Sequence, residues 1–114
     1  MTCVWNGLIN KLQLKMTPFE LCNFIKNNNT TTNNVFVNEE KIKEQQLKEN
    51  IERINNINNI NNGYDMSTCD PLLILIAEIY QVNIIHHFNG CKIIYKNVNA
   101  NKEIIVYSNS HHFW

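Results

Sequence analysis

Residues 70–95 read DPLLILIAEIYQVNIIHHFNGCKIIY, and this stretch decides the fold class. Asp70 and Pro71 are residue types favoured at a helix N-cap and at the first helical position, so they predict the start of a helix. Residues 72–80 are apolar on nearly every side, which indicates a central buried helix. The dipeptide Asn89-Gly90 then separates two β-type runs, residues 82–88 and 91–95, and predicts a hairpin.

A two-residue turn at Asn89-Gly90 also fixes which residues of the hairpin lie opposite each other. One apolar face is expected to pair Phe88 with Cys91, His86 with Ile93 and Ile84 with Tyr95. The other face pairs His87 with Lys92 and Ile85 with Ile94. A third strand is predicted at residues 103–107, after a polar loop. We therefore expect an antiparallel meander with helices packed on it, which is an α+β domain.

The N-terminal half is predicted to be helical. Apolar residues recur every three or four positions over residues 3–14, as on one face of a helix. Thr17, Pro18 and Glu20 form a capping-box pattern for a second helix. A third helix is expected at residues 39–54, where acidic and basic side chains alternate at i,i+4 spacing.

The 114 residues allow one domain, 1–114, with Asn-rich loops at 27–34 and 55–63. The formal net charge is zero, which argues against nucleic acid as the main partner. The longest apolar run, residues 72–77, is too short to span a bilayer, and no signal peptide is recognisable. We therefore expect an intracellular, cytoplasmic protein that has no membrane partner and whose cysteines are reduced. None of the four cysteines has C-x-x-C spacing, so no metal or cofactor is predicted.

Cys3 lies at the start of the first predicted helix, where backbone N–H groups and the helix dipole favour a thiolate. Position alone still favours an ordinary buried or terminal residue. A thiol nucleophile also needs a histidine. His86 is expected to be packed in the core, and His87 to face solvent. His111 and His112 follow the last strand, and only one of two adjacent residues can face Cys3.

The stretch Cys3-Val4-Trp5-Asn6-Gly7-Leu8 resembles the nucleophile helix of ovarian tumour-type (OTU) cysteine proteases. In that family the Cys is followed by two apolar residues, a polar one, a small one and an apolar one. At the other end, Ser110-His111-His112-Phe113 resembles the closing motif of the family, in which a strand leads into a His and an aromatic residue. The order of the two motifs spans nearly the whole chain.

The resemblance implies a papain-like fold and a thiol-dependent deubiquitinase that hydrolyses isopeptide bonds of ubiquitin or a ubiquitin-like protein. Cys3 would be the nucleophile and His112 the general base, with His112 preferred over His111 because Phe113 follows it. Asn109 is a candidate for the orienting residue by proximity alone. No cofactor is implied, and a monomer is expected.

Family members usually carry an Asp-Gly-x-Cys lead-in that helps to form the oxyanion hole, whereas only Met1 and Thr2 precede Cys3. In addition, Trp114 fills a position at which the family often has an acid or Asn. The alternative is therefore a weak or inactive OTU-fold module that binds ubiquitin. A third reading is an unrelated α+β scaffold.

Overall fold

The computed structural model describes residues 3–30, 34–57, 64, 66–109 and 112–114, and over this part of the chain the fold is α+β. Its helices are α1 (Cys3–Leu12), α2 (Pro18–Asn27), α3 (Glu44–Asn55) and α4 (Pro71–Tyr80). Its strands are β1 (Val35–Val37), β2 (Glu40–Lys41), β3 (Val82–Phe88), β4 (Cys91–Asn97) and β5 (Lys102–Ser108). The predicted combination of helices and a mostly antiparallel sheet is confirmed.

The hairpin of β3 and β4 has the predicted register. All five expected pairs are present, from Phe88 opposite Cys91 to Ile84 opposite Tyr95. Asn89 and Gly90 have φ values of 48° and 84°, the left-handed conformation that a type I′ turn requires. The turn chemistry therefore determines which side chains of this hairpin face the core.

The predicted C-terminal meander is wrong. The strands lie in the order β2-β1-β4-β3-β5, and β5 pairs with β3 in parallel rather than with β4. The reason is that β1 occupies the other edge of β4, with Val35 opposite Asn97 and Val37 opposite Tyr95. Because that edge is taken, β5 adds to the free edge of β3 instead, where Ile84 lies opposite Ile104.

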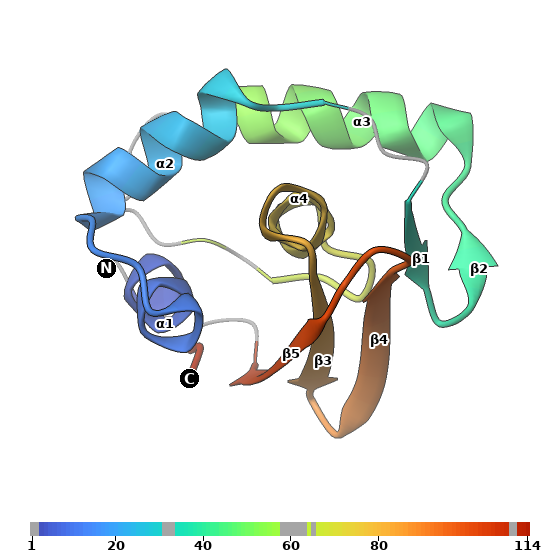
Figure 1. The fold of residues 1–114 in the computed structure, drawn as a ribbon. Helices are drawn as coiled ribbons and strands as arrows, with labels where there is room; N and C mark the ends of the chain where they lie inside the picture. The colour runs from blue at the N-terminus through green and yellow to red at the C-terminus, as the bar shows by residue number, and fades with distance from the viewer. Residues whose placement is uncertain (1–2, 31–33, 58–63, 65, 110–111) are drawn as a thin grey trace.

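Helix α4 is the centre of the core. All its residues from Pro71 to Ala77 are buried, as its apolar sequence predicts. Figure 1 shows α4 between the sheet on one side and α2 and α3 on the other, with α1 beside β5. Asp70 caps α4 from a fully buried position, and its carboxylate accepts hydrogen bonds from the Leu72 N–H, the Tyr64 hydroxyl and the Ser67 N–H and hydroxyl.

The two other predicted helix starts had different outcomes. The capping box of α2 is confirmed, with the Glu20 N–H donating to Thr17 and the Thr17 N–H donating to Glu20. The predicted start of the third helix at residue 39 is wrong, because α3 begins at Glu44. Asn38 and Glu39 have positive φ values, which turn the chain from β1 into β2. The residues before Glu44 are therefore in this hairpin and its connection, and not in the helix.

Among the described residues, no helix is both long and apolar enough to cross a membrane. Parts of the predicted loops 27–34 and 55–63, together with His111, lie outside the described residues.

Candidate functional site

Cys3 is the first residue of α1 and is partly exposed. The helix is held in place by buried Val4, Trp5, Leu8 and Leu12, which recur on one face. The first N–H groups of any helix lack intrahelical acceptors, and the dipole places partial positive charge at this end. Cys3 therefore lies at the end of α1 where backbone N–H groups are available to a bound anionic group.

His112 lies in the short connection by which the chain turns back on β5, and its side chain is exposed. Two backbone hydrogen bonds join Tyr107 and Trp114, with N···O distances of 2.8 and 2.7 Å. Ser108 and Phe113 form an antiparallel bridge between these segments. His112 is therefore attached to the edge of the sheet rather than to a free tail.

The contact between Phe113 and Gly7 brings the two ends of the chain together. A Cβ built on Gly7 would lie 2.7 Å from Cε1 of Phe113, so the ring occupies the space that a side chain would need. Cys3 and Gly7 are four residues apart on α1, which places them on the same face of the helix. The residue after His112 thus packs one turn from Cys3, and Figure 1 shows the C-terminus beside α1.

Asn109 contacts the backbone of His112. Its side-chain Oδ1 accepts a hydrogen bond from the His112 N–H at 2.8 Å, and its own N–H donates to the His112 carbonyl at 3.1 Å. These two bonds close the turn that carries the histidine. Asn109 therefore fixes the backbone from which the imidazole projects.

The other three cysteines are poorer candidates for a nucleophile. Burial raises the pKa of Cys22 and of Cys69, which disfavours the thiolate. Cys91 is exposed at the start of β4, opposite Phe88 on one face of the sheet, whereas the nearby His87 lies on the other face. Cys91 and His87 therefore do not form the thiol–imidazole pair that thiol catalysis needs, and the buried thiols of Cys22 and Cys69 are poor nucleophiles.

The internal histidines behave as the sequence predicts. His86 is completely buried, and its Nε2 lies 2.6 Å from the Ser108 hydroxyl. Burial, together with the charge of neighbouring His87, lowers the pKa of His86 to about 4, so it is neutral at physiological pH. His87 stacks on Tyr107 on the opposite face of the sheet. Both histidines therefore contribute to the packing of the sheet.

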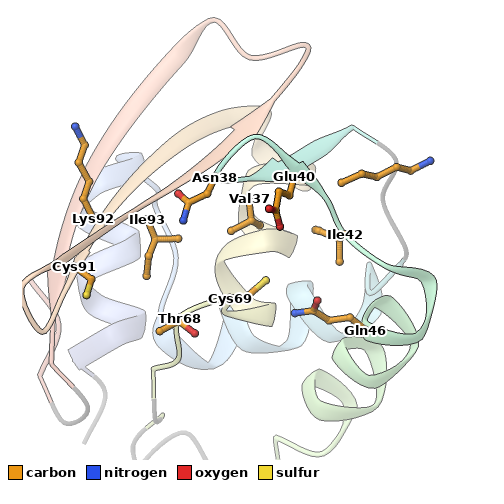
Figure 2. A pocket seen from close by; sticks show the side chains of 11 residues that line it. Val37, Asn38, Glu40, Ile42, Gln46, Thr68, Cys69, Cys91, Lys92 and Ile93 are labelled. Carbon is orange, nitrogen blue, oxygen red and sulfur yellow. The ribbon is translucent and has the colours of Figure 1, made fainter.

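A separate cavity of about 480 Å³ lies at the other end of the sheet. It is bounded by the hairpin of β1 and β2, Gln46 of α3, the Thr68–Cys69 loop and the start of β4. Figure 2 shows the Cys69 sulfur directed into it. The cavity has an apolar floor of Val37, Ile42 and Ile93, and neither Cys3 nor His112 lines it.

Sequence reasoning missed both this cavity and the role of Gly7 as a packing surface. The cavity depends on the β1–β2 turn. This turn was not predicted, because the charge pattern of residues 39–54 indicates a helix. The only sequence signal for Gly7 is a small residue one helical turn after Cys3. Among the described residues, no group of three His, Cys, Asp or Glu side chains could hold a metal ion.

Comparison of the chain with protein-family models, with curated proteins and with solved structures finds no match. The residues and geometry of this chain and its sequence resemblance to the OTU motifs are therefore what bears on its function.

Proposed function

We propose that the chain is an OTU-like, papain-type thiol hydrolase that cleaves isopeptide bonds of ubiquitin or a ubiquitin-like protein inside the cell. Cys3 is the nucleophile, His112 the general base, and Asn109 a positioning residue for His112. The observation that carries the proposal is the packing of Phe113 on Gly7, one helical turn from Cys3.

In this mechanism His112 takes the thiol proton as the Cys3 sulfur attacks the isopeptide carbonyl carbon. The tetrahedral intermediate collapses when His112 returns the proton to the leaving lysine amine, and a thioester remains on Cys3. Water, deprotonated by His112, then hydrolyses the thioester and regenerates the thiol. Backbone N–H groups at the start of α1 are suited to stabilise the oxyanion, because they carry partial positive charge.

The exposure of His112 and its fixed turn support the assignment of the base. The imidazole projects from a loop that two Asn109 hydrogen bonds and the Tyr107–Trp114 pairing hold against the sheet. A base must be within hydrogen-bond reach of the thiol in the productive complex, although this contact is often longer without substrate. The packing of the Phe113 ring on Gly7 supports a position of the His112 backbone near α1.

The test is hydrolysis of a ubiquitin–lysine isopeptide substrate by the wild-type chain and by three variants. Cys3→Ala and His112→Ala should each abolish cleavage. Cys91→Ser is the matched control, because it removes another accessible thiol and should leave the rate unchanged. No cleavage by the wild type, or cleavage that persists in Cys3→Ala, contradicts the proposal.

The second candidate is a ubiquitin-binding module without catalysis. It is favoured by Trp114, whose indole can neither accept a proton from nor orient an imidazole as a carboxylate or amide oxygen would. This reading predicts that ubiquitin binds, that no isopeptide bond is cleaved, and that binding is unchanged in His112→Ala. The same set of variants distinguishes the two.

A further inference from the structure

The outer face of the sheet carries several exposed apolar side chains. Figure 1 shows the helices on the other side of the strands. Accordingly, side chains along β4 and β5 alternate between buried and exposed. Four of the seven large apolar side chains that are exposed among the described residues lie on this face: Ile94 (39%), Ile105 (40%), Tyr107 (40%) and Trp114 (57%).

The side chains of this outer face form three rows across the strands. The register places Ile94 opposite Ile85, and Ile85 opposite Ile105, so a row of three isoleucines crosses the centre. The row above it contains Lys92 and a stack of three rings from His87, Tyr107 and Trp114, with centroid separations of 4.7 and 6.2 Å. The row below contains Lys96, Asn83 and Glu103.

This arrangement is complementary to itself. Consider a twofold axis that is parallel to β3 and lies midway between two facing sheets. It places β4 of one copy over β5 of the other, with the same row of side chains in contact. Ile94 then meets Ile105, Lys92 meets the Tyr107 ring, and Lys96 meets Glu103. Each contact occurs twice, which is the defining property of an isologous interface. Two sheets packed with their strands nearly aligned also have the ordinary geometry of a β-sandwich.

We propose that the outer face of the sheet binds a second copy of this chain, forming a twofold symmetric dimer through β3, β4 and β5. The pairing is apolar at its centre and joins opposite charges at its lower border, and a chain with zero net charge has little overall repulsion to overcome. This inference is independent of the proposed catalytic function and replaces the monomer expected from the sequence.

The small size of the face indicates a weak dimer. Three strands spaced ~4.8 Å apart and three rows of side chains give roughly 300 Å² per copy. Stable complexes bury about 800 Å² per partner, so the dimer should be weak and reversible. We expect a dissociation constant on the order of tens of micromolar, as for transient interfaces of low area.

The test is sedimentation velocity of the full chain from a few micromolar to about 1 mM, a range that brackets a weak interface. The wild type should shift from monomer to dimer. Lys96→Glu and Glu103→Lys each place like charges together and should weaken association about tenfold, whereas the double swap should restore it. Lys15→Glu and Glu52→Lys are the charge-matched controls on exposed positions outside the face.

Three results would overturn the inference. One is a wild-type chain that stays monomeric over the whole range. Another is a dimer that neither single swap weakens. The third is a double swap whose effect is the sum of the two single losses, because only direct Lys96–Glu103 pairing between copies predicts recovery. Circular dichroism of each variant checks that its fold is intact.

Discussion

The ring of Phe113 fills the space beside Gly7 that a helical residue would ordinarily use for its own side chain. This contact joins the last described residues of the chain to the first helix, and it is the feature on which the proposed site depends. It also gives Gly7 a defined role, although glycine is a poor helix former.

Gly7→Ala should destabilise the protein, although alanine is favoured over glycine within a helix by about 1 kcal/mol. The added Cβ would overlap the buried Phe113 ring, and overpacking of this kind costs roughly 1–3 kcal/mol. Urea unfolding measures the change. In a Phe113→Ala background the same substitution should become stabilising by up to about 1 kcal/mol, because only the propensity gain remains. Equal effects in both backgrounds would show that the two residues do not touch.

Asn109→Ala should reduce isopeptide cleavage about tenfold, the rate equivalent of one lost hydrogen bond near 1.4 kcal/mol. The variant loses the acceptor for the His112 N–H, so the turn that carries the base becomes less restricted. Asn109→Asp keeps an acceptor oxygen at this position and should retain most of the activity. Steady-state kinetics of both variants provide the test. Equal loss in both would mean that the amide nitrogen, not the turn, is what matters.

The buried His86 should make the protein less stable in mild acid. In the unfolded chain a histidine binds a proton below about pH 6.5. The folded chain resists protonation until about pH 4, because burial lowers the pKa of His86. The unfolded state therefore binds more protons between these values, and stability falls as the pH drops through this window, by at most about 3 kcal/mol.

His86→Gln provides the matched comparison for this pH effect, since glutamine can still reach Ser108 but does not titrate. The difference in unfolding free energy between wild type and variant should shrink as the pH falls from about 6.5 to about 4. Asp70, whose pKa burial raises, contributes with the opposite sign in both proteins and so cancels. A difference that stays constant with pH would contradict the assignment of a neutral, buried His86.

The two helix caps should differ in their importance. Asp70→Ala should cost about 3–5 kcal/mol, because it removes a buried cap and leaves the Tyr64 and Ser67 hydroxyls and two N–H groups without their acceptor. Thr17→Ala removes an exposed cap and should cost only about 1 kcal/mol. Urea unfolding of both variants tests the comparison, and similar losses would mean that burial adds nothing at Asp70.

Local chemistry predicted a good part of this fold. The Asn89-Gly90 turn determined the β3–β4 register, and the Thr17 and Asp70 caps determined where α2 and α4 begin. What failed was non-local. Nothing near β5 in the sequence reveals that Val35–Val37 occupies the edge of β4, and this competition sends β5 to β3. The β1–β2 turn was missed because Asn38 and Glu39 adopt left-handed conformations that neither residue type requires.

The candidate site, like the fold, could be predicted from the sequence only in part. From the residues themselves, helix-end placement made Cys3 plausible without selecting it, and strand alternation eliminated His87 and made His86 less favoured. The choice of His112 needed the family resemblance, because a His-aromatic pair carries little information alone. That Phe113 would pack on Gly7 could not be foreseen, since it depends on how the chain turns back after β5.

Cys3 can be identified as the nucleophile by reacting the intact protein with ubiquitin that carries a thiol-reactive C-terminus and mapping the adduct by peptide mass spectrometry. We expect one ubiquitin per chain, attached at Cys3, with the adduct lost in Cys3→Ala, greatly slowed in His112→Ala and unaffected in Cys91→Ser. Attachment at Cys91 or another thiol, or no adduct in the wild-type protein, would contradict this assignment of the nucleophile.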